Sequence, residues 1–131
     1  MSSVVFFTTY FKGTGAVGVK HPPFEEIERM LREIDSGRVL ALKLFKCYEW
    51  EGSGEQHLAI FGKQSLYHVS EWILGEETHT FCNEEVDPVD SVEIDGYPYQ
   101  LKQFCTDLDV VIAIASEYFD HGKLSDKVKW W

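Results

Sequence analysis

Cysteine is scarce in this sequence, and long apolar runs are absent. The 131 residues contain three cysteines, Cys47, Cys82 and Cys105, an odd number at wide spacing. That usage suits a reducing compartment better than a disulfide framework. No run approaches the roughly 20 apolar residues that a membrane span needs, and the first residues carry no basic region. We therefore expect a cytoplasmic protein with no secretory signal and no membrane association.

Basic residues are missing from one long stretch of the chain. Residues 64–101, the acidic segment, contain nine Asp and Glu and no Lys or Arg, and the whole chain has a net charge of −10. A negative field repels phosphate backbones and attracts basic proteins. We therefore expect no direct binding of nucleic acid. The acidic segment is either a solubilising face or the contact surface for a basic partner.

The hydrophobic pattern predicts one domain over residues 1–131 with an α+β fold, in which two α-helices pack on a mainly antiparallel β-sheet. One helix is expected from Pro22-Pro23 to Gly37, and the other from Asp107 to His121 with Thr106 as its N-cap. Tyr97-Pro98 follows a D-G turn, and the proline predicts an edge strand there. The expected strands cover residues 3–11, 38–50, 57–61, 65–74, 78–82, 92–94, 97–101 and 127–131.

Gly13, Gly15 and Gly18 match the pattern G-x-G-x-x-G of dinucleotide-binding proteins. In those proteins the glycine turn leads directly into a helix whose free N–H groups hold the pyrophosphate. Here three residues and two prolines come between, and Asp35 lies at the far end of the helix. The pattern therefore predicts a flexible glycine loop over residues 12–21. Whether residues 13–18 contact a partner stays open.

Candidate catalytic and metal-binding residues form no recognised motif. His57, His68 and His79 recur every eleven residues, a spacing that could make two of them neighbours across strands. No C-x-x-C or H-E-x-x-H pattern accompanies them, and the cysteines have no local signature. We expect no metal, no cofactor and no catalytic residue. A cysteine–histidine pair assembled in space is an alternative.

Aromatic and acidic residues occur together in the acidic segment, a composition typical of a protein-binding face. Strand alternation in residues 65–74 predicts that Leu66, His68, Ser70 and Trp72 share one face of the sheet. The expected partner-binding residues are Trp72, Glu76, Glu77, Glu84, Glu85, Asp87, Asp90, Tyr97 and Tyr99.

The C-terminal part of the chain carries a family resemblance. Residues 92–98 (VEIDGYP) lead through a helix to residues 118–130 (YFDHGKLSDKVKW). An aromatic–Phe pair, then x-x-G-x-L, three residues, Val, one residue and Trp resembles the C-terminal signature of the bacterial immunity proteins known as "immunity protein one". The resemblance implies no catalytic residue. The matching residues look structural: Phe119, Gly122, Leu124, Val128 and Trp130.

The same resemblance implies a cytosolic antidote that binds a toxin domain encoded by an adjacent gene and blocks its active site. Toxins linked to this family are often nucleic-acid deaminases. A toxin that acts on nucleic acid needs a basic surface, which an acidic inhibitor covers well. We therefore expect an immunity protein and not an enzyme. A small Cys/His enzyme and a ligand-binding module without a toxin partner are the alternatives, and the oligomeric state stays open.

Overall fold

The fold is seen in a computed structural model that describes residues 4–46, 56–63, 65–87, 89–94 and 96–131. Cys47, Asp95 and the turn expected at residues 51–55 lie outside the described residues. An eight-stranded sheet has the order β10-β6-β5-β4-β3-β1-β2, with β9 paired to β5, and a separate two-stranded sheet pairs β7 with β8. The strands of the larger sheet are β1 (Phe6–Phe11), β2 (Gly15–Lys20), β3 (Val39–Phe45), β4 (Gln56–Lys63), β5 (Leu66–Ile73), β6 (Glu76–Cys82), β9 (Phe104–Cys105) and β10 (Lys129–Trp130).

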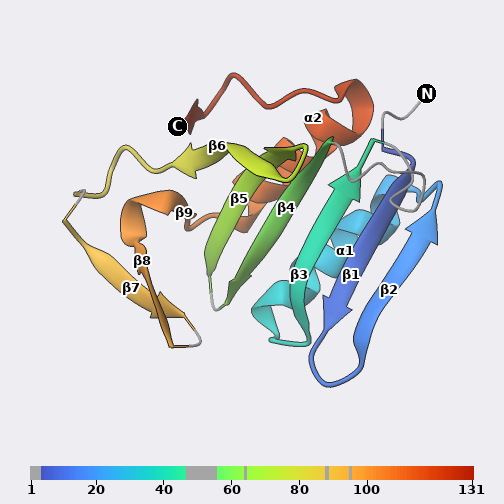
Figure 1. The fold of residues 1–131 in the computed structure, drawn as a ribbon, viewed down its shortest axis with the longest axis horizontal. Helices are drawn as coiled ribbons and strands as arrows, with labels where there is room; N and C mark the ends of the chain where they lie inside the picture. The colour runs from blue at the N-terminus through green and yellow to red at the C-terminus, as the bar shows by residue number, and fades with distance from the viewer. Residues whose placement is uncertain (1–3, 47–55, 64, 88, 95) are drawn as a thin grey trace.

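Both helices, α1 (Phe24–Asp35) and α2 (Leu108–His121), lie on one face of this sheet (Figure 1). The smaller sheet, β7 (Ser91–Ile94) and β8 (Tyr97–Gln100), projects beside it and continues into the short 3-10 helix η2 (Leu101–Gln103). Every strand pair is antiparallel. The predicted α+β fold with two helices on a mainly antiparallel sheet is confirmed.

The core lies between the helices and the sheet. α1 buries Ile27, Leu31 and Ile34 because these residues recur at spacings of three and four along one stripe. α2 buries Val111, Ile114, Ala115 and Tyr118 in the same layer. The residues of the C-terminal signature also belong here, since Phe119, Leu124, Val128 and Trp130 pack against the core and Gly122 caps α2 in the left-handed region.

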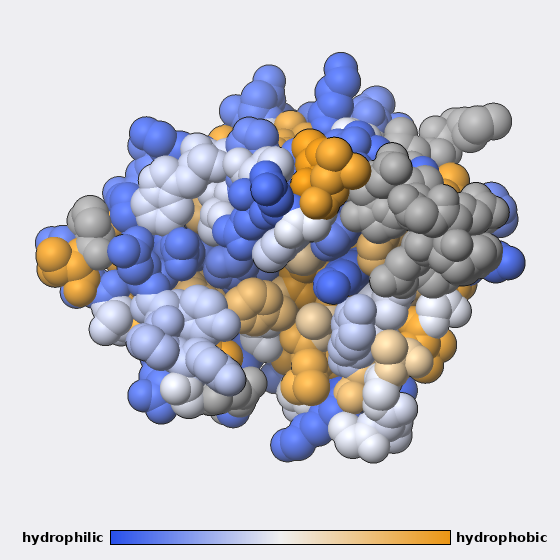
Figure 2. All heavy atoms as spheres, viewed as in Figure 1, coloured by the Kyte–Doolittle hydropathy of each residue, from blue (hydrophilic) through white to orange (hydrophobic). Residues whose placement is uncertain are grey.

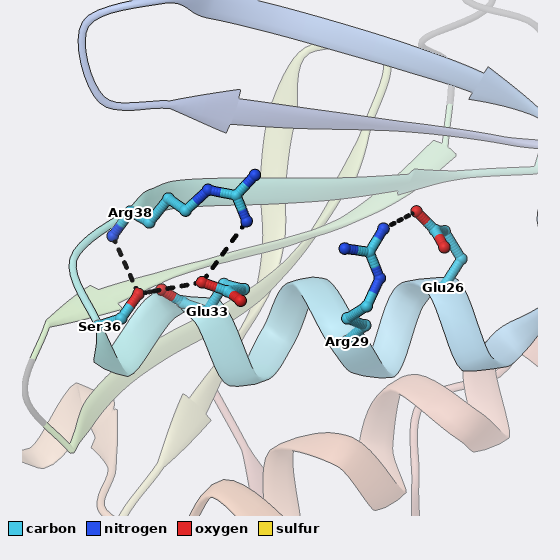
Figure 3. Close-up of polar contacts among 5 residues, drawn as sticks. All are labelled: Glu26, Arg29, Glu33, Ser36 and Arg38. Carbon is cyan, nitrogen blue, oxygen red and sulfur yellow. Dashed lines mark hydrogen bonds and ion pairs between the residues drawn. The ribbon is translucent and has the colours of Figure 1, made fainter.

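Polar contacts fasten the end of α1 to the start of β3 (Figure 3). Ser36 Oγ donates to the backbone oxygen of Glu33 at 2.7 Å and accepts from the backbone N–H of Arg38 at 3.3 Å. The Arg38 guanidinium lies 3.6 Å from the Glu33 carboxylate, and Arg29 pairs with Glu26 one turn earlier. Exposed pairs of this kind contribute a few tenths of a kcal/mol each to the free energy of unfolding. They therefore orient the chain after α1 more than they stabilise the fold.

The glycine-rich segment is a β-hairpin, and the prediction of a flexible loop over residues 12–21 is wrong. β1 and β2 pair from Phe6↔Lys20 to Phe11↔Gly15, and Gly13 and Gly15 supply the positive φ angles of the turn. Val17 and Val19, on either side of Gly18, favour a strand because they are β-branched. The glycines therefore close a hairpin instead of leading into a helix.

Asp35 joins the end of α1 to the turn between β4 and β5. Its Oδ1 accepts a hydrogen bond from the backbone N–H of Ser65 at 3.0 Å and another from the hydroxyl of the buried Tyr67. Burial and the Asp35 carboxylate together raise the pKa of Tyr67 well above its ordinary value. Asp35, the acidic residue of the nucleotide-like pattern, thus has a structural role.

Several boundaries differ from the predictions. Asp107 is the N-cap of α2 instead of Thr106, because its carboxylate accepts from the backbone N–H of Asp109 at 2.9 Å. The sequence pattern also gave no sign of β9, which has only two residues. Pro98 lies in the two-stranded sheet, where each strand is an edge, as predicted.

We predict that Tyr67→Phe lowers the free energy of unfolding by about 1 kcal/mol, because Asp35 loses one of its two donors while the buried ring stays in place. Urea denaturation followed by circular dichroism measures the change. Tyr97→Phe, at an exposed position, is the matched control and should leave the midpoint unchanged. Equal midpoints for wild type and Tyr67→Phe would contradict the role given to this bond.

Candidate functional site

The sheet face that carries no helix, here called the open face, holds a pocket of about 390 Å³. Its floor is a row of cross-strand partners in which Lys43 on β3 pairs with Ala59 on β4, and Ala59 pairs with Ser70 on β5. The two small side chains at the centre of this row leave space above the backbone. Figure 2 shows apolar atoms gathered near the middle of this face.

Two pairs of aromatic rings stand on either side of the small residues. His57 and Trp72 are cross-strand partners whose rings stack 6.2 Å apart at 3°. On the other side Phe61 and His68 are partners whose rings stack 4.8 Å apart at 20°. Since side chains two residues apart on a strand point the same way, both ring pairs stand on the same face as Ala59. The pocket is therefore a slot between two aromatic walls.

One cation and one anion line the slot from opposite sides. Lys43 projects from β3, with its Nζ 5.5 Å from the centre of the Tyr10 ring. Glu77 projects from β6, and its carboxylate accepts a hydrogen bond from the Thr80 hydroxyl. β4 and β5 lie between β3 and β6, so the two charges face each other across the slot without forming an ion pair with each other.

Both histidines of the slot favour the neutral imidazole. Burial and, to a smaller extent, the nearby Lys43 ammonium together lower the pKa of His57 from 6.5 to about 4. Burial also lowers the pKa of His68, against a smaller opposing effect of Glu77. The Nδ1 atom of His68 is buried and has no hydrogen-bond partner within the described residues. At neutral pH the slot thus offers uncharged rings with polar edges.

Sequence reasoning did not single out this slot. The signal lies in two five-residue stretches, His57-x-Ala59-x-Phe61 and His68-x-Ser70-x-Trp72, each with a small residue between two ring-bearing ones on the same strand face. The predicted alternation of residues 65–74 is confirmed, because Tyr67 and Val69 lie in the core while His68 and Trp72 line the pocket.

The expected partner-binding acids lie along and beyond β6. Glu76 and Glu77 are at its start, next to the turn that follows β5. The other four follow its end, in residues 83–87, 89 and 90, here called the acidic loop, which lies at the far left of Figure 1. All six are exposed: Glu76, Glu77, Glu84, Glu85, Asp87 and Asp90.

The acidic loop is held by its own polar contacts. The Asn83 and Asp87 side chains accept from backbone N–H groups two residues later, at 3.0 and 3.1 Å. The ammonium of Lys102 donates to the backbone oxygens of Asn83 and Val86 at 3.2 and 3.0 Å. The carboxylates therefore project from a defined backbone.

The three expected aromatic contact residues occupy different surroundings. Tyr97 is 68% exposed on β8. Tyr99 is half-buried, and its ring packs 5.7 Å from both Phe61 and Phe104, which fixes the β7–β8 hairpin to the open face. Trp72 is also half-buried, and its Nε1 donates to Ser70 Oγ at 2.9 Å. Of the three, only Tyr97 presents most of its ring to solvent.

The three histidines are not neighbours. His57 and His68 stand at opposite ends of the slot, and His79 lies 3.5 Å from the buried Glu71 carboxylate on the other face. No group of three or more metal-ligating side chains occurs within the described residues. Cys82 and Cys105 are buried, and burial raises the pKa of Cys105, which disfavours the thiolate. Cys47 lies outside the described residues.

Residues 4–128 match a protein family described as "Family of unknown function (DUF6911)". The chain belongs to this family. The match spans both helices, every strand that lines the slot, and the acidic loop. Neither helix in the described part of this DUF6911 chain is long and apolar enough to cross a membrane.

A solved structure supports the fold of this DUF6911 protein. It is similar to the crystal structure of a hypothetical protein from Neisseria gonorrhoeae, with a TM-score of 0.58 and 15% identity. The similarity covers 88% of this chain and 85% of that chain. Comparison with curated proteins gives no match. At this identity the likeness concerns the fold alone.

We predict that the free energy of unfolding decreases as the pH is lowered from about 6.5 to about 4, in part because the pKa of His57 is lower in the folded protein. The unfolded chain takes up a proton near pH 6.5, whereas folded His57 resists protonation until about pH 4. The stabilisation is therefore complete above 6.5 and is lost as the pH falls. Urea titrations at pH 7 and pH 4.5 should show a smaller difference for His57→Phe than for wild type.

Exposed His121 provides the control for this measurement, because His121→Gln removes an imidazole outside the slot. That variant should not show the reduced loss at low pH. In the wild type, the His57 ring proton shifts in an NMR titration should have a midpoint near 4. A midpoint near 6.5 would contradict the assignment.

Proposed function

We propose that this protein is an immunity protein that acts in the cytoplasm, where it binds and neutralises a toxin domain encoded by an adjacent gene. The observation that carries the proposal is the exposure of six carboxylates of the acidic segment, two on β6 and four on the acidic loop, whose described residues make hydrogen bonds with their own backbone and with Lys102. The resemblance of residues 92–130 to the immunity-protein signature supports the same function. Binding requires no catalytic residue, metal or cofactor from this chain.

Apolar side chains accompany the acids at both ends of β6. Leu74 is 74% exposed at the turn before the strand, and Val89 is 83% exposed in the acidic loop after it. Stable protein interfaces combine apolar contact area with a charged rim. An acidic surface with exposed apolar side chains therefore suits a partner that presents basic and apolar residues together.

A toxin that acts on nucleic acid fits this description. Its substrate-binding surface carries Lys and Arg that contact phosphates. An acidic inhibitor seated on that surface replaces the phosphates and is drawn to it by long-range attraction, which mainly speeds association. We propose a nucleic-acid-targeting toxin, such as a deaminase, blocked at its active site or substrate-binding surface.

The test is a titration of this protein into the purified C-terminal toxin domain of the adjacent gene, at low and high salt. We predict one-to-one binding in the nanomolar range that weakens as salt rises. The double variant Glu84→Lys/Glu85→Lys should lower the association rate constant at low salt by about tenfold. Neither carboxylate caps a backbone N–H in the described loop, and the ion pair of Glu84 with Lys129, at 3.7 Å, is exposed and therefore weak, so the loop should keep its conformation.

The matched control is Asp120→Lys/Asp126→Lys, which changes the net charge equally at exposed positions outside the acidic segment. This variant should bind at nearly the wild-type rate. Equal slowing by both variants would show that net charge alone matters and would remove the acidic loop from the interface. No binding of the wild type to the adjacent gene product would refute the proposed function.

A further inference from the structure

We propose that the slot on the open face binds a small planar aromatic compound that carries a carboxylate. The inference goes beyond the proposed function, since it concerns a small ligand and needs no protein partner. It rests on the shape of the slot, on a lysine beside it that has no ion-pair partner among the described residues, and on polar groups at its walls.

The shape of the slot suits a flat ligand. The ring pairs His57–Trp72 and Phe61–His68 are two residues to either side of Ala59 and Ser70, so they are separated by about 13 Å along the strands. When the thickness of the wall side chains is subtracted from this separation, the remaining space above Ala59 accommodates a compound of one or two rings. A volume of about 390 Å³ lies within the range of small-molecule sites. Aromatic walls favour a ring through stacking and edge contacts.

The charges select a carboxylate and its orientation. Lys43 is half-buried at the slot and has no ion-pair partner in the part of the chain that the structure describes, although the protein carries a net charge of −10. A ligand carboxylate would supply that partner. Glu77 on the opposite side repels an anion, so the carboxylate must lie toward β3 and the ring toward β5.

Polar atoms at the walls match the edge of such a ring. His68 is 6% exposed and lines the slot. The Ser70 hydroxyl accepts from Trp72 Nε1 and retains its own proton for a further bond. The Glu77 carboxylate lies on the same side of the slot and accepts hydrogen bonds. A ring with one N–H, and a carboxylate at its other end, is complementary to this arrangement.

The test uses indole-3-acetate as the probe and indole-3-acetamide as its uncharged counterpart. Each is titrated into the full chain, and binding is followed by NMR shifts of Trp72 Nε1–H and the His68 ring. We expect saturable shifts with indole-3-acetate, a Kd of about 10–100 μM, and at least tenfold weaker binding of the acetamide. Cyclohexaneacetate, an anion without an aromatic ring, should bind at least tenfold more weakly as well.

Three variants locate the site. Ala59→Leu fills the slot from its floor and should abolish the shifts at 1 mM probe. Lys43→Met should weaken indole-3-acetate about tenfold and leave the acetamide unchanged. Lys63→Met removes an exposed lysine at the end of β4 and should change neither. Circular dichroism and thermal melting establish whether each variant is folded. If Ala59→Leu does not fold, Lys43→Met still tests the site.

Each negative outcome has a distinct meaning. No saturable shift with any probe up to 5 mM overturns the ligand site. Equal binding of acetate and acetamide, or an unaffected Lys43→Met, overturns the assignment of a carboxylate. Because no toxin is present, these results are independent of the titration with the adjacent gene product.

Discussion

The antiparallel pairing of β4 with β5 determines both faces of the sheet. It runs from Gln56↔Ile73 to Lys63↔Leu66 without a register shift. Because strand side chains alternate, the same register places Leu58 and Ile60 in the core and Ala59 on the floor of the slot. A slip of one residue would exchange the two sets and place apolar side chains in solvent. The core and the slot therefore depend on one another.

Local patterns in the sequence predicted most of the fold. α1 was predictable because prolines precede it, an apolar stripe runs along it and Gly37 follows its end at a positive φ. β5 was predictable because residues that favour strands, such as Tyr67, Val69 and Trp72, precede a turn at Gly75. β2 was missed because its glycines obscured the strand preference of Val17 and Val19, and because its partner, β1, lies across a tight turn. Pairing with β1 therefore compensates for the weak strand preference of the glycines in β2.

The slot was harder to predict because it arises between strands. Neither His57-x-Ala59-x-Phe61 nor His68-x-Ser70-x-Trp72 forms a wall alone. The walls form only when the register sets His57 beside Trp72 and Phe61 beside His68. The exposed acids, by contrast, were predictable from composition, because a segment with nine acids and no base cannot bury most of them, although Glu71 is buried. Composition gave no sign of the packing of Tyr99, whose ring contacts Phe61 and fixes the β7–β8 hairpin to the open face.

Among the described residues, β7 and β8 pair with each other, and a backbone hydrogen bond from Leu101 N–H to the Asp90 oxygen, at 3.0 Å, closes the base of the hairpin. Its residues contribute nothing to the register of the large sheet. Substitutions at its exposed positions, such as Tyr97, thus leave the strand pairing of the large sheet intact. The sequence of this small sheet can therefore vary at its exposed positions while the strand pairs of the large sheet stay the same.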